Sequence, residues 1–159
     1  MIIELSPQEM ITAGTIGVRR QVAALFQNRR PSHGAHDNSD SRAFDDHIIG
    51  AMAEYAVAKT LNLFWDPSIG KVKKGDVGGF VEVRVRRVGG TGLDLVIRPG
   101  DEDDAPYVLV HAEVPRFFIK GWLYGRDGKA GGFVWNEQRR LWFIPPEKIN
   151  AIEELKTHA

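Results

Sequence analysis

The chain opens with small and apolar residues that recur at helical spacing. The members of this stripe are Ile11, Gly14, Val18, Val22 and Leu25. The stretch SPQE before it carries the signals of a helix start: Ser6 can cap the helix, Pro7 suits its first position and Glu9 completes a capping box. The pattern predicts a first helix that runs to about residue 28.

The next segment, RRPSHGAHDNSDS at 29–41, is polar and has no apolar period, which predicts a loop. The spacing of its His33 and His36 would suit a metal ion if the segment were helical. Gly34 and the turn-forming residues around it favour a solvated loop over a metal site.

A second apolar stretch, HIIGAMAEYAVAKTLNL, predicts another helix that ends near Asn62. Asp45 or Asp46 suits its start, because an acidic side chain stabilises the N-terminus of a helix. The stretch is apolar on most of its surface, so we expect a central helix buried in the core.

The second half of the chain is made of short β-like runs separated by Gly, Pro and Asp. The runs are 69–74, 79–87, 93–98, 106–112, 117–124, 132–136 and 140–144. Their connections are too short for crossover helices, so several runs should be antiparallel neighbours. The closing PPEKINAIEELK predicts a terminal helix. This order of elements predicts an α+β protein.

Composition fits one globular domain and excludes several other classes. The chain has 159 residues, of which 43% are hydrophobic and 26% charged. It has no cysteine, which excludes disulfides, a thiol nucleophile and a Cys-ligated zinc site. No apolar run is long enough to span a membrane, and MIIELSPQEM lacks the pattern of a signal peptide. We therefore expect a cytoplasmic protein.

Charge is balanced over the whole chain but unevenly distributed along it. Formal net charge is zero, which argues against a protein that simply coats nucleic acid. Residues 71–98 carry seven Lys/Arg against three Asp/Glu, 101–113 carry five acids and no Lys/Arg, and 116–140 carry six basic residues against two acids. The two basic segments could form one basic face in the fold, or the charges could simply alternate over the surface.

Glu54 is the acid of the second predicted helix, and its helical neighbours are small or apolar. These neighbours, three and four positions away, are Gly50, Ala51, Val57 and Ala58. A buried carboxylate normally needs a cation, a metal or a hydrogen-bond donor as its partner. The alternative is that Glu54 and Lys59 together form the one solvent-exposed stripe of the helix.

The stretch GDVGGFVEVRVRR predicts a hairpin that gathers three charged side chains. Alternation along the strand puts the valines at 81, 83 and 85 on one face and Glu82 and Arg84 on the other. A turn at Gly78-Gly79 would bring Asp76 next to them. Two carboxylates here, with a third from the helix, would suit Mg²⁺, which prefers oxygen ligands and keeps waters for a substrate phosphate to displace.

A helix Glu followed by Asp76 and by Glu82-Val83-Arg84 resembles the PD-(D/E)XK nuclease superfamily. The wider string HIIGAMAEYAVAKTLNLFWD…DVGGFVEVR…DDAPYVLV…FIKGWLYGRD…WFIP is similar to small nuclease-like proteins encoded in phages and prophages. The resemblance covers roughly residues 44–146. It implies a restriction-endonuclease-like core with a mixed, largely antiparallel sheet flanked by helices.

The resemblance also implies a domain layout. We expect a single nuclease-like domain over 1–159, with an N-terminal helix at 1–28, a polar loop at 29–44, the core at 45–146 and a C-terminal helix at 147–159.

By the same resemblance, Asp76, Glu82 and the backbone carbonyl of Val83 would bind Mg²⁺, with Mn²⁺ as a substitute. Glu54 would bind or position the ion through a water. The catalytic set would be Glu54, Asp76, Glu82 and Arg84.

The sequence departs from the superfamily pattern at two positions. Gly75 stands where a proline is common, which the superfamily tolerates. Arg84 occupies the lysine position, and an arginine cannot be deprotonated to act as a base. It can still act as a fixed cation on the transition state. Lys73 or Lys74, on the facing strand, could supply an ammonium group instead.

These features predict a metal-dependent nuclease that hydrolyses phosphodiester bonds, with DNA as the expected substrate. Backbone phosphates would contact Lys71, Lys73, Lys74, Arg86 and Arg87. One alternative is a nuclease-fold accessory protein that has weak or no catalysis and binds nucleic acid or a partner protein. Another is a structural component that assembles through exposed aromatic residues. A homo-oligomer is compatible with each.

Overall fold

The computed structural model describes residues 1–27, 41–69, 75–90, 92–138 and 140–156, and it confirms the first helix. Helix α1 spans Pro7–Phe26 and ends two residues before the predicted end. The capping box is present: Ser6 Oγ accepts from Glu9 N at 3.3 Å, and Glu9 Oε2 accepts from Ser6 N at 2.7 Å. Two orphan amides at the helix start are satisfied in this way.

The apolar stripe that predicts α1 does not form its buried face. Ile11 is 64% exposed, and Val18 and Val22 are each 39% exposed. The buried positions are instead Ala13, Gly17 and Gln21, which pack against the next helix. The inward face is selected by size, because the two helix backbones approach more closely than large side chains would allow. A Cβ atom on Gly17 would lie 2.4 Å from the Cα of Ile48.

Helix α2 spans Ser41–Leu61 and is the buried central helix that the sequence predicts. Its start is four residues earlier than the predicted boundary at 45, so residues 41–44 are helical and not loop. The prediction that Asp45 or Asp46 begins the helix is therefore wrong. Their carboxylates instead face Arg87, at 3.6 and 2.7 Å. His33 and His36 lie outside the described residues.

Two sheets hold the strands. The larger has the order β1-β5-β4-β2, built from Ile2–Glu4, Arg116–Tyr124, Pro106–Glu113 and Glu82–Arg87. Strands β1 and β4 run antiparallel to β5, whereas β2 runs parallel to β4 at the edge. The smaller, antiparallel sheet has the order β3-β7-β6, from Leu95–Ile97, Leu141–Ile144 and Val134–Asn136. The α+β class and the mixed sheet are thus confirmed.

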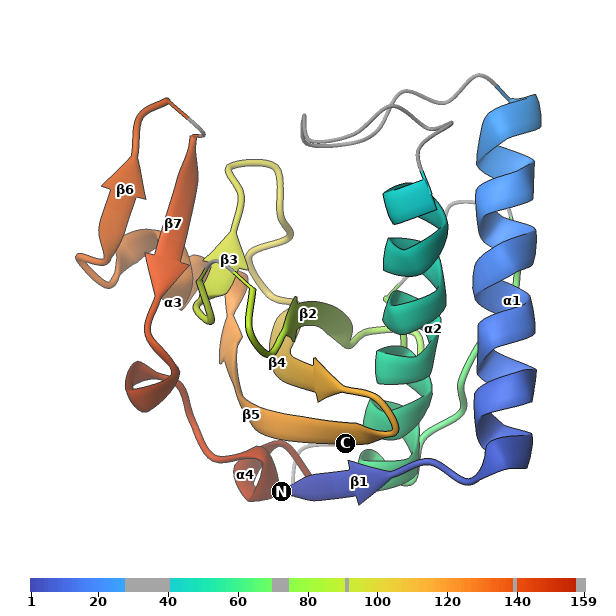
Figure 1. The fold of residues 1–159 in the computed structure, drawn as a ribbon. Coiled ribbons are helices and arrows are strands. Elements are labelled where there is room, and N and C mark those ends of the chain that lie inside the picture. Colours follow the sequence, from blue (N-terminus) through green and yellow to red (C-terminus); the bar gives the residue numbers. More distant parts are fainter. Residues whose placement is uncertain (28–40, 70–74, 91, 139, 157–159) are drawn as a thin grey trace.

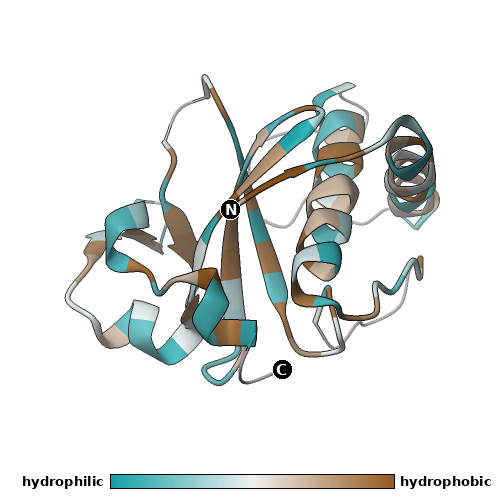
Figure 2. Ribbon diagram, turned by 90° about the horizontal axis from the view of Figure 1, so that it is seen from below, coloured by the Kyte–Doolittle hydropathy of each residue, from teal (hydrophilic) through white to brown (hydrophobic). Residues whose placement is uncertain are grey.

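The elements stack in layers around the large sheet (Figure 1). Helix α2 lies between α1 and the sheet, and the small sheet lies on the other side (Figure 1). Seen from below, the strands of the large sheet carry hydrophobic segments between these two sides (Figure 2). One apolar core joins α2 to the large sheet, and a second, built around Tyr107, Leu109 and Ile144, lies beneath the small sheet.

The remaining elements are short. Helix α3, Gly125–Ala130, follows β5 directly, and the sequence pattern does not predict it or β1. The predicted terminal helix is broken into a 3-10 turn η1, Pro146–Lys148, and helix α4, Ile152–Lys156. The break occurs where Asn150 pairs with Trp122 of β5, since both Asn150 backbone groups are used by that bridge. Of the predicted run 69–74, residues 70–74 lie outside the described part of the chain.

No helix in the described residues has the length and apolar character needed to cross a membrane.

Candidate functional site

The predicted hairpin around Asp76 is present and tight. Gly78 and Gly79 both have positive φ, at 61° and 79°, a conformation that glycine adopts without strain. Val77 pairs with Val81 across this turn, with both backbone hydrogen bonds made. The double glycine therefore folds the chain back on itself and places Asp76 beside the start of β2.

The Asp76 carboxylate is fixed at the first residues of β2. Its Oδ2 accepts a hydrogen bond from Val83 N at 2.9 Å. Glu82 is the residue before Val83 and the first residue of the strand. The hairpin thus brings Asp76 and the Glu82-Val83 segment together, as the sequence predicts. The Glu82 side chain lies on the other face of the strand from Val83, because neighbours alternate.

Strand alternation in β2 also follows the prediction. Val81 is fully buried, and Val83 and Val85 pack against the core that β2 shares with α2. Glu82, Arg84 and Arg86 therefore face away from α2, toward the side of the small sheet. Glu82 and Arg84 lie side by side there, with Glu82 Oε2 at 3.5 Å from Arg84 Nη1.

Arg84 has two further contacts, which the sequence does not signal. Its Nη2 donates to Asp101 Oδ1 at 3.0 Å. Its guanidinium lies over the Tyr107 ring, 4.7 Å from the centroid. Burial, reinforced by Asp101, raises the pKa of Tyr107 to about 12. The Tyr107 side chain is therefore neutral where the guanidinium stacks on it. Asp101 lies 17 residues after Arg84, in the loop that follows β3. No local pattern therefore reveals the contact between them.

Glu54 is buried and paired, which decides between its two interpretations. Glu54 is 8% exposed, so it does not belong to a solvent-exposed stripe of the helix. Lys59, the other proposed member of that stripe, pairs instead with Glu9 of α1 at 2.7 Å. The predicted need of Glu54 for a partner is confirmed by two side chains. Arg20 Nη1 lies 2.7 Å from its Oε1, and Trp65 Nε1 donates to its Oε2 at 3.0 Å.

Arg20 is a residue that the sequence analysis misses. It lies three positions after Gly17 on the inward face of α1, where small residues otherwise predominate. A lone cation on a small-residue face is the signal that could have identified it as the partner of a buried acid. Trp65 connects this pair to the hairpin, since its backbone pairs with Val77, the residue after Asp76.

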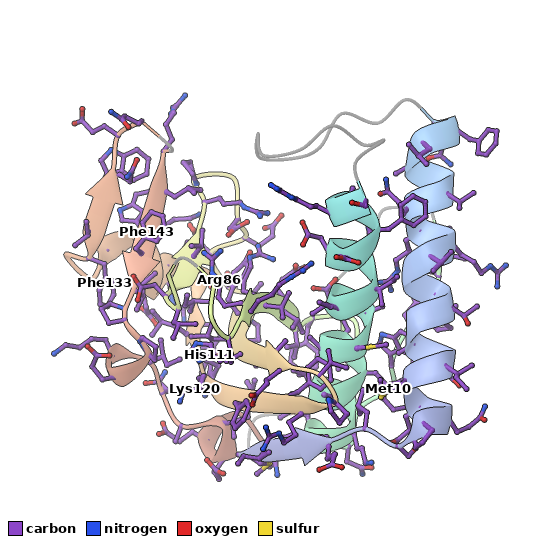
Figure 3. All side chains as sticks on the ribbon, viewed as in Figure 1. Met10, Arg86, His111, Lys120, Phe133 and Phe143 are labelled. Atoms are coloured by element: carbon purple, nitrogen blue, oxygen red, sulfur yellow. The ribbon has the colours of Figure 1, made fainter. Side chains whose placement is uncertain are left out.

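The predicted phosphate-binding residues lie in different surroundings. Arg87 is bound by Asp45 and Asp46 at the start of α2. Arg86 donates from Nε to the Asp94 carbonyl at 3.0 Å. Arg86, His111 and Lys120 lie one after another across β2, β4 and β5 (Figure 3). Lys71, Lys73 and Lys74 lie outside the described residues.

The acidic side chains of the predicted site do not form a metal-ligand group among the described residues. Across the described ranges, no group of three or more His, Asp or Glu side chains could hold a metal ion, and Glu54, Asp76 and Glu82 are all described. The two hairpin carboxylates have the oxygen chemistry that Mg²⁺ accepts. Each oxygen of Glu54 accepts from a neighbouring side chain, Oε1 from Arg20 and Oε2 from Trp65.

No protein-family model matches the chain, and no curated protein or solved structure is significantly similar to it. The relation to the PD-(D/E)XK nucleases therefore stays a prediction from the residues themselves.

Proposed function

We propose that this chain is a metal-dependent nuclease that hydrolyses phosphodiester bonds, with DNA as its first candidate substrate. The observation that carries the proposal is the hydrogen bond from Val83 N to Asp76 Oδ2 at 2.9 Å. It fixes a carboxylate beside the strand that opens with Glu82-Val83-Arg84, the order that the nuclease resemblance requires. Two carboxylates, a strand carbonyl and a guanidinium lie at one hairpin.

Asp76, Glu82 and the Val83 carbonyl would hold Mg²⁺ or Mn²⁺, with waters completing the coordination. A bound metal would supply hydroxide at neutral pH by lowering the pKa of a coordinated water, and would neutralise charge on the phosphate. In this proposal Glu54 is a positioning residue. It holds the Trp65 indole, and the Trp65 backbone holds Val77 next to Asp76.

Arg84 would bind the scissile phosphate as a permanent cation. A guanidinium keeps its proton throughout the physiological pH range, so its role is to stabilise the charge that develops on the phosphate oxygens. Asp101 and Glu82 hold the guanidinium in place, and the Tyr107 ring supports it from one side. Arg86, Arg87 and the lysines at 71, 73 and 74 would contact neighbouring phosphates.

A second candidate is a nucleic-acid-binding protein that has the same fold and no catalysis. One observation favours it: Glu54, Glu82 and Arg84 of the predicted catalytic set are each engaged in an ion pair within the protein. Glu54 pairs with Arg20, and Glu82 pairs with Arg84, which also binds Asp101. In this case the hairpin would position cations for the nucleic-acid backbone without activating water.

Cleavage and metal binding separate the two functions. The purified chain is incubated with labelled single- and double-stranded DNA and RNA, with Mg²⁺, with Mn²⁺ and with a chelator. A nuclease cleaves at least one substrate in a metal-dependent way, and Asp76→Ala and Glu82→Gln abolish cleavage. Glu153→Gln, an exposed acid on α4, is the matched control and retains it.

Calorimetry with Mn²⁺ completes the test. The nuclease proposal fails if no substrate is cleaved and no metal binding depends on Asp76. Nucleic-acid affinity that is independent of metal and unchanged in Asp76→Ala/Glu82→Ala would establish the second candidate.

A further inference from the structure

Three arginines lie around Asp101, in the loop that follows β3. Asp101 accepts from the Arg84 guanidinium and from the backbone N of Arg98, and Arg86 follows Arg84 by two residues on β2. We call Arg84, Arg86 and Arg98 the arginine cluster. Arg84 and Arg86 lie close enough to Arg98 to act on its charge. Burial and the repulsion from Arg84 lower the pKa of the Arg98 guanidinium, and Asp101 opposes this effect. The positive charges of the arginine cluster thus lie near one another in partly buried surroundings.

The carboxylates near Arg84 and Arg98 pair with Arg84 and not with the Arg98 guanidinium. Asp101 uses Oδ1 for Arg84 Nη2 and Oδ2 for the backbone N of Arg98. Glu82 faces Arg84. In the described ranges, the Arg98 guanidinium has no carboxylate within ion-pair distance. Both carboxylates are therefore directed at Arg84, and neither pairs with the Arg98 guanidinium.

The remaining acids of this loop are engaged elsewhere. Asp103 pairs with Lys129 at 2.6 Å, and Asp104 pairs with Arg126. Both cations belong to α3. Asp103 and Asp104 are thus neutralised by α3, and neither pairs with the Arg98 guanidinium.

Two donors in the arginine cluster are also unsatisfied. The Nε atoms of Arg84 and Arg98 are buried, and neither meets an acceptor among the residues that the structure describes. A buried donor without an acceptor costs roughly 1–3 kcal/mol, so native proteins normally supply a partner. A bound anion would give these N–H groups an acceptor and would also offset the repulsion between the two cations.

We propose that Arg84 and Arg98 together bind a phosphate group. A guanidinium presents its donors in a planar fork that matches the oxygens of a phosphate, and two such forks can grip one group from two sides. Arg86 adds positive charge to the same place. The Arg84 side chain is 16% exposed and Arg98 is half-buried, so the site is partly open to solvent. Arg98 is thereby a phosphate-binding residue that sequence analysis does not find.

The identity of the phosphate rests on the proposed function. If the chain acts on or binds nucleic acid, the occupant is a backbone phosphate next to the hairpin. The anion site itself depends only on the arginine cluster and requires no metal and no cleavage.

The test uses metal-free protein with a chelator and inorganic phosphate as the probe. Amide chemical shifts and thermal unfolding are followed as phosphate is added. We expect saturable shifts centred on 82–86 and 97–102, and a rise in melting temperature. Arg98→Gln should weaken phosphate binding at least about tenfold, the loss expected for one charge-assisted contact. Without phosphate, Arg98→Gln should unfold no earlier than the wild type, because it removes a repelling charge.

Arg116→Gln is the matched control, since Arg116 is half-exposed and pairs with Glu113 away from the cluster. It reports the general stabilisation that phosphate gives to any protein as an excluded salt. Arg98→Lys keeps the charge and should bind phosphate more tightly than Arg98→Gln. Equal phosphate affinity in wild type and Arg98→Gln, or shifts that do not saturate, would overturn the site.

A short single-stranded oligodeoxynucleotide then identifies the source of the phosphate. Competition between it and inorganic phosphate supports a backbone phosphate as the occupant. Phosphate binding without competition would overturn that identity and assign the site to a free phosphate. If the protein binds phosphate through Arg98 but cleaves no substrate, the nuclease proposal fails and the phosphate site stands. Failure of the proposed function can therefore be distinguished from failure of the proposed site.

Discussion

Arg20 of α1 and Glu54 of α2 form a buried ion pair, with 2.7 Å between Nη1 and Oε1 and side chains that are only 12% and 10% exposed. The pair joins residues 34 positions apart in the sequence. Through the second oxygen of Glu54 it also fixes the Trp65 indole, which packs edge-on against Tyr55. The helix pair and the segment that leads to the hairpin are thus held by one carboxylate.

We expect Glu54→Ala to destabilise the protein by about 3 kcal/mol, because it leaves the buried Arg20 charge without its carboxylate and the Trp65 N–H without its acceptor. Chemical unfolding measures the effect. The double variant Arg20→Met/Glu54→Met should recover most of the loss, since replacing both charges by apolar side chains removes the unpaired cation. Lys59→Ala, which breaks the exposed Lys59–Glu9 pair, is the control and should cost less than about 1 kcal/mol. A Glu54→Ala protein as stable as the control would mean that the ion pair does not hold the helices.

The close approach of the two helices at Gly17 gives a second prediction. A methyl group there would meet the backbone of Ile48 at 2.4 Å, so Gly17→Ala must push α1 away from α2. We expect the free energy of unfolding to fall by about 2 kcal/mol or more, in the upper part of the range for overpacked cores.

Gly50 of α2 is the matched control, since nothing lies within 4 Å of its missing Cβ. Gly50→Ala should stabilise the protein by roughly 0.5–1 kcal/mol, because alanine loses less backbone entropy in a helix. Urea unfolding of both variants measures the difference. Similar stability changes in the two would show that the helices do not pack through Gly17.

Local patterns in the sequence predict the parts of this fold that local forces determine. The capping box at Ser6, the alternation of valines in β2 and the turn at Gly78-Gly79 all occur as predicted, because each depends on neighbouring residues. The need of Glu54 for a partner could be predicted in the same way, since burial of a carboxylate has a fixed cost.

The features that were missed depend on tertiary contacts. The inward face of α1 follows Ala13 and Gly17, whereas the larger Ile11 and Val18 lie outward, because the helix spacing leaves no room for large side chains. Parallel pairing of β2 with β4 joins strands separated by β3, which no local pattern encodes. Asp101 and Arg20 find their partners only in the folded chain, so the sequence shows them as ordinary surface charges.

Stability should fall as the solution becomes acidic, and His111 is one cause. His111 is 7% exposed, and its Nε2 must donate to the Leu93 carbonyl, 2.8 Å away, since a carbonyl can only accept. Burial lowers the pKa of His111 below its usual value, with help from Lys120 and Arg86 and against the Leu93 contact and Asp94. The unfolded chain then binds the proton more readily than the folded one. The stability contribution is present above about pH 6.5 and is lost as the pH falls through the folded pKa.

Urea unfolding at a series of pH values measures this loss, which should not exceed about 1.4 kcal/mol per pH unit for one histidine. The ring shifts of His111 in NMR should titrate below those of a histidine in a short peptide. His111→Gln should flatten the pH dependence in part. The residual slope belongs partly to His47, whose pKa is lowered by burial and by the nearby charge of Arg20. A His111 that titrates at or above the peptide value would contradict the prediction.

Asp101 competes with the proposed phosphate for Arg84, and this gives the last prediction. Asp101→Asn keeps an oxygen for the Arg98 backbone but removes the negative charge from the arginine cluster. Without phosphate we expect the free energy of unfolding of this variant to fall by about 1.5–3 kcal/mol, the contribution typical of a hydrogen bond to a charged group. With phosphate the variant should recover much of that loss and bind the anion more tightly than the wild type, because Arg84 has lost its internal carboxylate. Asp103→Asn, at the exposed end of the Lys129 pair, is the control and should change stability by less than about 1 kcal/mol. If phosphate bound to Asp101→Asn more weakly than to the wild type, Asp101 would be a part of the anion site and not its competitor.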